Sequence, residues 1–303
     1  MSLKENRKKE FEGAVDPITL SVIYNRLLAI NEEMGITMIN TSISPIFAEA
    51  HDFSCAICDW DNRIVAQIDG VPSHTASAME SVKAVSAYFG DDINPGDIFL
   101  LNDPYSGGTH LPDLTVMKPI FYKGELQFVA INRAHHGDVG GIDPGSYCPS
   151  ATELFHEGIR IPPLRIYKDE KPIMDVIDMI RFNTRMPDEL WVDTKAMVAS
   201  CRVAEKRIFE LLDKYGVEKT RNTIETIHQY AERRMRKEIE NLKDGVYEGE
   251  SFLDSDGFID KPVRIKVTIE IKGDEAFVDF DGTDDQVTGF INSPIANTAT
   301  CVY

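Results

Sequence analysis

The chain has 303 residues, of which 43% are hydrophobic, so it can bury one large core or two modest ones. Acidic residues outnumber basic ones by 50 to 32, and the net charge of −18 disfavours nucleic acid and anionic membranes as partners. The opening residues form a charged tail without the apolar stretch of a signal peptide, and no later run is apolar enough to span a membrane. These features predict a cytoplasmic protein.

A long helix is the first predicted element. Asp16 can cap its start and Pro17 suits its first turn, and apolar residues then recur at spacings of three to five until about residue 39. Two short apolar runs follow at 52–58 and 63–68, on either side of a polar turn. They predict a β-hairpin.

Five cysteines spread over the chain do not form a disulfide framework, and they fit a reducing compartment. Cys55 and Cys58 have the Cys-x-x-Cys spacing of redox and zinc sites. They lie in the first apolar run, and no second cysteine pair is present to complete a four-ligand zinc site. We therefore interpret them as small core residues, with a redox or zinc role as the alternative.

The middle of the chain combines strands with two glycine-rich loops. A helix is predicted over about 74–89, and strands over 98–102, 115–122 and 125–132. One loop follows the first of these strands and the other loop follows the last. Loops that are presented by a rigid sheet are where binding and catalytic residues tend to lie.

The final third is predicted to be a helical hairpin followed by strands. Apolar residues at helical spacing run from about 187 to 243, with a break at Tyr215-Gly216. The basic run at 233–237 is interpreted as a solvated helix face rather than an anion site. Beyond Gly245 the pattern alternates as in strands.

These elements predict an α+β fold, in which mixed sheets of hairpin-connected strands present the loop pair, with an N-terminal helix and a helical hairpin. We expect three regions. They are an α+β region that carries the loops (1–184), the helical hairpin (185–244), and a β-rich segment (245–303) that begins a further region truncated at the C-terminus.

Imidazole and carboxylate groups are concentrated in the two loops, residues 102–113 and 134–141. Six of the seven histidines fall between positions 51 and 156. Neutral imidazole nitrogens and ionised carboxylates are ligands of divalent transition metals, and mixed His/Asp sets suit Zn, Mn or Fe(II). The sequence therefore predicts a metal site where the loops converge, with candidate ligands His110, Asp113, His135 and either Asp52 or Glu49.

The neighbouring residues give weaker signals. His136 and Asp138 are candidates for orienting the ligands or acting as a base. Four glycines either permit tight turns only or let substrate or phosphate approach the backbone, namely Gly107, Gly108, Gly140 and Gly141. Three histidines taken singly are interpreted as surface or capping residues, namely His51, His74 and His156. The sequence contains no P-loop, dinucleotide fingerprint or nucleophile elbow, so no ATP site is expected in it.

A series of short motifs follows in order along the chain, at Asp16-Pro17, 49–54, 72–74, 95–97, 102–110, 135–141, 144–146, 157–158 and 279–283. This ordered series resembles the hydantoinase B/oxoprolinase family. Members of that family include subunits of ATP-dependent hydantoinases, oxoprolinases, caprolactamase, and acetone or acetophenone carboxylases. Its members continue well beyond the length of this chain.

The resemblance implies a hetero-oligomer with an A-type ATP-binding subunit, which would phosphorylate a small-molecule substrate. This chain would then use a metal, held by Asp52, His110, Asp113 and His135, to hydrolyse the activated cyclic amide, as in N-methylhydantoinases and oxoprolinases. His136 or Asp138 would act as base or ligand orienter. Two alternatives stay open: carbon–carbon bond formation in a ketone carboxylase, and a non-catalytic scaffold with a structural metal. Without its partner the chain is not expected to be active.

Overall fold

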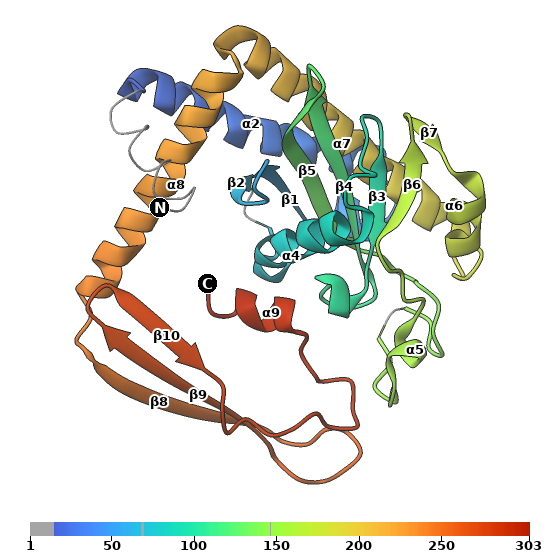
Figure 1. Cartoon of the computed structure of the whole chain (residues 1–303). Coiled ribbons are helices and arrows are strands. Elements are labelled where there is room, and N and C mark those ends of the chain that lie inside the picture. Colours follow the sequence, from blue (N-terminus) through green and yellow to red (C-terminus); the bar gives the residue numbers. More distant parts are fainter. Residues whose placement is uncertain (1–14, 68–69, 146) are drawn as a thin grey trace.

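The computed structural model describes residues 15–67, 70–145 and 147–303 (Figure 1). Its helices are α2 (Pro17–Thr41), α3 (Pro45–Ala48), α4 (Pro72–Phe89), α5 (Leu154–Glu157), α6 (Met174–Arg181), α7 (Pro187–Tyr215), α8 (Val217–Glu240) and α9 (Ile295–Thr300), with a 3-10 turn η1 (Pro104–Ser106). Its strands are β1 (Phe53–Asp59), β2 (Ile64–Gln67), β3 (Ile98–Leu101), β4 (Asp113–Tyr122), β5 (Glu125–His135), β6 (Leu164–Lys168), β7 (Lys171–Pro172), β8 (Gly245–Leu253), β9 (Val263–Lys272) and β10 (Glu275–Asp279). The α+β class is confirmed.

The longer predicted elements are present. The first helix is α2, and Asp16 caps it by accepting a hydrogen bond from the backbone N–H of Thr19 at 2.9 Å. The β-hairpin is the antiparallel pair β1–β2. The helical hairpin is α7 and α8, which meet at Gly216, whose φ of +80° favours glycine. Short elements such as α6 and β7 were not predicted, because they span too few residues to establish a period.

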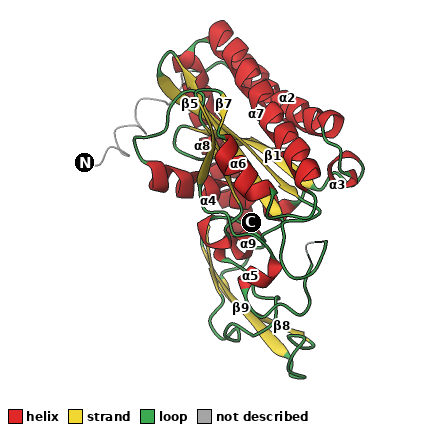
Figure 2. Ribbon diagram, turned by 90° about the vertical axis from the view of Figure 1, so that its right-hand side faces the viewer, coloured by secondary structure: helices red, strands yellow, loops and turns green. Residues whose placement is uncertain are grey.

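Seven strands form the main sheet, in the order β2-β1-β5-β4-β3-β6-β7. The sequence predicted mixed sheets, but every described pair is antiparallel, as hairpin connections favour. Helices α2 and α7 cover one face of this sheet and α4 covers the other (Figure 2). Helix α7 therefore shares its core with the strands of the predicted first region.

Strand β1 shows the consequence of covering both faces, because all seven of its residues are buried. Side chains alternate between faces along a strand, so Cys55 joins the core beneath α2 and α7, whereas Cys58 joins the core beneath α4. Both cysteines are free, and burial raises the pKa of each thiol to about 12. Their interpretation as core residues is confirmed.

A second sheet, with the order β10-β9-β8, lies at the far end of α8 (Figure 1). Most of its residues are exposed on both faces, including large apolar ones such as Val246, Phe252 and Phe277. In the part of the chain that the structure describes, no helix is both long and apolar enough to cross a bilayer.

Candidate metal centre

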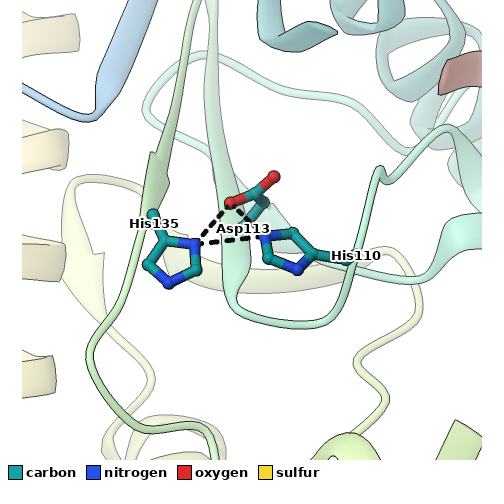
Figure 3. Close-up of side chains that lie close together, drawn as sticks. All are labelled: His110, Asp113 and His135. Carbon is teal, nitrogen blue, oxygen red and sulfur yellow. Dashed lines mark hydrogen bonds and ion pairs between the residues drawn. The ribbon is translucent and has the colours of Figure 1, made fainter. Parts of the chain in front are cut away.

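Two adjacent strands bring a carboxylate and an imidazole face to face. Asp113 is the first residue of β4, His135 is the last residue of β5, and the two are direct partners in the antiparallel register. His110 lies three residues before Asp113, in the loop that leads into β4. The Nε2 atom of His110 lies 2.9 Å from Oδ1 of Asp113 and 3.1 Å from Nδ1 of His135 (Figure 3). The same Nδ1 lies 3.2 Å from Oδ1 of Asp113.

The loop that carries His110 is held by a buried asparagine at the end of β3. The side-chain amide of Asn102 donates to the carbonyl of Leu111 at 2.7 Å and to that of Ile159 at 2.9 Å. Its oxygen accepts from the backbone N–H of Ile161 at 2.7 Å. Because the side chain of Asn102 hydrogen-bonds to the backbone at Leu111, it holds the loop next to His110 in place.

The charges of the three side chains are strongly coupled. Burial alone would raise the pKa of Asp113, but hydrogen bonds from His110, His135 and His74 outweigh it and hold that pKa well below its usual value. Burial lowers the pKa of His110, yet the hydrogen bond and charge of Asp113 raise it overall. The carboxylate is therefore ionised at neutral pH.

These three ligand atoms have the spacing of one ion's coordination shell. Among the described residues, His110, Asp113 and His135 form a group whose ligand atoms all lie within 4.8 Å of one another. Ligands at about 2.1 Å from an ion lie about 3.0 Å apart at right angles and about 3.4 Å apart in a tetrahedron. The distances here run from 2.9 to 3.2 Å. Two imidazoles and one carboxylate thus fit a divalent transition metal, with the remaining coordination positions free for water or substrate.

The fourth predicted ligand lies beside this group. The carbonyl of Asp52 accepts a hydrogen bond from the backbone N–H of His135 at 3.1 Å, and the carboxylate of Asp52 contributes to the raised pKa of His110. Glu49, the alternative, is an exposed residue at the end of α3. Asp52 is therefore hydrogen-bonded directly to His135 through the backbone, although it lies outside the group of three clustered ligand atoms.

The two residues proposed as base or orienter point elsewhere. His136 follows the last residue of β5, and its buried ring packs 5.2 Å from the ring of Phe47; burial lowers its pKa to about 4. Asp138 binds Arg185, whose Nη1 lies 2.9 Å from Oδ2, and accepts the backbone N–H groups of Arg185 and Gly140. In this arrangement Asp138 anchors the second loop.

The four loop glycines all lie against protein backbone. A Cβ on Gly107 would approach the backbone N of Ser81 to 2.3 Å, and a Cβ on Gly108 would approach the Asn102 carbonyl to 2.3 Å. The corresponding contacts of Gly140 and Gly141 are 2.6 Å and 2.5 Å, also to carbonyl oxygens. Close packing accounts for glycine at these positions without a ligand.

Sequence reasoning missed one histidine. His74 was interpreted as a surface or capping residue, but it is 3% exposed, and its Nε2 lies 3.2 Å from Oδ2 of Asp113. The signal that could have found it is the polar series His74, Ser77 and Ser81, which falls on one face of a helix that covers the sheet. The other two fit the interpretation: His51 is exposed, and His156 accepts from the backbone N–H of Thr152.

Residues 16–303 match the family model described as hydantoinase B/oxoprolinase. The chain belongs to this family. It is 38% identical to the beta subunit of caprolactamase from Pseudomonas jessenii, over 96% of this chain and 50% of that protein. It is 32% identical to the B-type subunit of a putative D-/L-hydantoinase from Pseudomonas sp. (strain NS671), over 94% of this chain and 50% of that protein. The chain thus spans about half the length of these relatives.

Solved structures agree with this placement in the hydantoinase B/oxoprolinase family. The ATP-dependent caprolactamase from Pseudomonas jessenii superimposes with a TM-score of 0.91 at 38% identity, over 96% of this chain and 50% of that one. The nucleotide-free structure of acetone carboxylase superimposes with a TM-score of 0.86 at 19% identity, over 98% and 40% of the two chains. At that identity the second likeness shows the fold alone.

In this hydantoinase B/oxoprolinase family member His110, one of the three clustered residues, lines a pocket of about 230 Å3. The wall of this pocket also includes Glu157 and several residues of the segment 286–294, among them Phe290. The ring of Tyr147 lies 6.2 Å from that of His110 and 6.4 Å from that of Phe290. Aromatic rings therefore flank the approach to His110.

Proposed function

We propose that this chain is the metal-binding part of a B-type subunit of an ATP-dependent cyclic amide hydrolase, acting on a substrate that a partner A-type subunit phosphorylates. The observation that carries the proposal is the cluster of His110, Asp113 and His135 at a strand end, beside a pocket. Relatives at 31% to 38% identity support the reaction class, since they are named caprolactamase, hydantoinase and 5-oxoprolinase.

The metal would be held by the nitrogens of His110 and His135 and by Oδ1 of Asp113, with Asp52 as a fourth ligand. A divalent ion at this position, Zn, Mn or Fe, supplies a Lewis acid that activates water at neutral pH and polarises a substrate oxygen. Two imidazoles with carboxylates beside a pocket are typical of catalytic metal sites, whereas structural zinc sites are built mainly from cysteine and are closed to water. This favours a catalytic ion over the scaffold alternative.

The chain's own residues then orient the substrate and handle protons. The pocket would receive the substrate next to His110, and the rings of Tyr147 and Phe290 would exclude water from one side of it. Glu157 lines the same pocket and is half-buried, and burial raises its pKa. We assign it the proton transfer to the leaving ring nitrogen, because Asp138 and His136 are engaged elsewhere.

Ketone carboxylation is the second candidate for the same architecture. The acetone carboxylase structure shares the fold at 19% identity, whereas the caprolactamase relative is 38% identical. The hydrolase is therefore preferred. A product test separates the two, because hydrolysis opens a ring, whereas carboxylation consumes bicarbonate and forms a carbon–carbon bond.

The experiment begins with metal content, measured by plasma mass spectrometry on the purified chain and on its folded His110→Ala and His51→Ala variants. We expect about one Zn, Mn or Fe per chain in the wild type and in the His51 control, and loss in the His110 variant. Assays with the A-type partner, ATP and a panel of cyclic amides then test the reaction. Full ring opening by the complex containing His110→Ala would contradict the proposal.

A further inference from the structure

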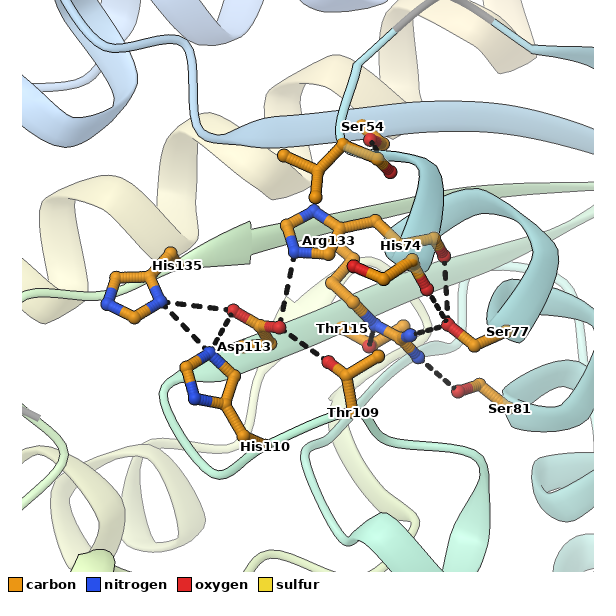
Figure 4. Close-up of polar contacts among 12 residues, drawn as sticks. Ser54, His74, Ser77, Ser81, Thr109, His110, Asp113, Thr115, Arg133 and His135 are labelled. Atoms are coloured by element: carbon orange, nitrogen blue, oxygen red, sulfur yellow. Dashed lines mark hydrogen bonds and ion pairs between the residues drawn. The ribbon is translucent and has the colours of Figure 1, made fainter. Parts of the chain in front are cut away.

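The two oxygens of Asp113 have different surroundings. Oδ1 faces His110 and His135, whereas Oδ2 is held from the opposite side (Figure 4). The hydroxyl of Thr109 donates to Oδ2 at 2.5 Å, and Nε2 of His74 lies 3.2 Å from the same oxygen. With Oδ2 held at two points, the carboxylate cannot rotate without breaking a contact, so Oδ1 stays directed at the two imidazoles.

The environment of His74 determines which of its nitrogens carries the proton. The ring is 3% exposed, and within the described part of the chain its Nδ1 has no hydrogen-bond partner. A protonated Nδ1 would therefore be a buried donor without an acceptor, which is unfavourable. The tautomer that donates from Nε2 to Oδ2 of Asp113 avoids this cost.

Helix α4 presents two further polar side chains on the same face as His74, at positions three and seven residues later. Ser77 and Ser81 both accept hydrogen bonds from the guanidinium of Arg133, which is fully buried. Arg133 also donates to the carbonyl of Gly107 at 2.7 Å and to the hydroxyl of Thr115 at 2.7 Å. This network clamps α4 onto the loop that leads to Asp113.

That loop packs directly against α4. Gly107 has a φ of +86°, and its Cα lies so close to α4 that an added Cβ would reach the backbone N of Ser81 at 2.3 Å. The hydroxyl of Ser81 donates to the carbonyl of Gly107 at 3.0 Å. His74 is therefore held at a fixed distance from Asp113 by the same helix that fixes the loop.

We propose that His74 and Thr109 are positioning residues, which orient the Asp113 carboxylate toward a metal ion and so set the affinity of the site. This inference rests on the metal site of the proposed function. Residues that hydrogen-bond to metal-binding carboxylates and imidazoles commonly raise metal affinity in this way. A purely structural role would not need a histidine here, because an apolar side chain could fill a buried position without leaving a ring nitrogen unpaired.

The test is the affinity of the purified chain for Zn and Mn, measured by competition with a chromogenic chelator at one neutral pH. Two pairs of variants are compared, His74→Leu with His74→Gln, and Thr109→Val with Thr109→Ser. We expect the apolar variants to bind about 10- to 100-fold more weakly, and the conservative variants, which keep a donor, to recover most of the affinity. His228→Leu is the matched control, because His228 also contacts a buried aspartate but lies away from the site.

Thermal unfolding of the metal-free variants provides the readout for structure. A positioning role predicts that both apolar variants bind metal more weakly even where the thermal unfolding midpoint of the metal-free protein is unchanged. If the wild type binds metal and folded Thr109→Val or His74→Leu binds it with unchanged affinity, the inference is overturned. The proposed metal site is not contradicted by that result. If the wild type itself binds neither ion after reconstitution, the proposed function fails and the inference fails with it. The Thr109 pair decides the question if His74→Leu does not fold.

Discussion

His228 lies with its Nε2 3.1 Å from Oδ2 of Asp59, and this contact joins helix α8 to the end of strand β1. Asp59 is fully buried, and its Oδ2 also accepts from Nε of Arg63 at 2.8 Å. Arg63 in turn donates to Glu225 of α8 at 2.8 Å. A small charged network therefore fastens the helical hairpin to the β1–β2 hairpin, apart from the two glycine-rich loops at 102–113 and 134–141.

The network predicts a loss of stability in acid. Burial raises the pKa of Asp59, but the hydrogen bonds from His228 and the backbone and charge of Arg63 outweigh it and lower the pKa overall. A depressed folded-state pKa stabilises the protein above the unfolded value of about 3.9, and that contribution is lost as the pH falls through the folded value. Urea unfolding should show Asp59→Asn destabilised by about 1–3 kcal/mol at neutral pH. The gap from wild type should narrow near pH 3.

Asp169→Asn is the matched control for this experiment, because the side chain of Asp169 is 85% exposed. Its unfolding free energy should stay within about 0.5 kcal/mol of wild type at both pH values. An Asp59 variant whose deficit is the same at pH 3 as at neutral pH would show that shape, and not charge, accounts for the loss.

Metal binding should raise the unfolding temperature of the chain. A ligand that binds only the folded state stabilises it by about 2.7 kcal/mol at a hundredfold excess over its dissociation constant. We expect Zn or Mn to raise the melting temperature of the wild type, and a chelator to reverse the rise. In His110→Ala, which lacks one of the three ligand atoms, the shift should largely disappear. An equal shift in both proteins would place the ion elsewhere.

Gly107→Ala should destabilise the site loop more than Gly124→Ala destabilises its own turn. Both glycines have a φ of +86°, so an alanine at either position carries about 1–2 kcal/mol of left-handed strain. Only at Gly107 does the added Cβ also meet backbone, at 2.3 Å, whereas nothing lies within 4 Å at Gly124. Denaturant unfolding and metal titration of the two variants would isolate the clash. Equal stabilities would mean that the loop can withdraw from α4.

Asp138 can be tested as an anchor or as a base. If it anchors the second loop, Asp138→Ala should loosen that loop, and Arg185→Met should loosen it less, because Asp138 still accepts the backbone N–H groups of Arg185 and Gly140 in that variant. Hydrogen exchange of residues 139–142 should then rise in both variants. If Asp138 is instead a base, Asp138→Asn should abolish turnover by the complex while exchange in the loop stays at the wild-type level, and Arg185→Met should be active.

The proximity of His110, Asp113 and His135 could be predicted because these residues lie in loops that adjoin the ends of predicted strands. The hairpin between 113 and 135 brings two such strand ends together. The part that His74 plays could not be predicted in this way. Its partner Asp113 is distant in sequence, and only the packing of α4 on the sheet brings them to 3.2 Å. The direction in which His136 points could not be predicted either. It depends on which residue ends the strand, and the sequence pattern does not locate strand ends to a single residue.

The direct pairing of Asp113 with His135 makes the site a reporter of strand alignment. Side chains alternate between faces, so sliding β4 past β5 by one residue would turn either the aspartate or the histidine away from its partner. The buried ring of His136 shows where the next residue along points, into the core beside Phe47. An ion that requires both groups would therefore bind the correctly aligned hairpin and not its slipped neighbour. During folding, an available metal ion would therefore stabilise the correctly paired hairpin relative to the slipped one.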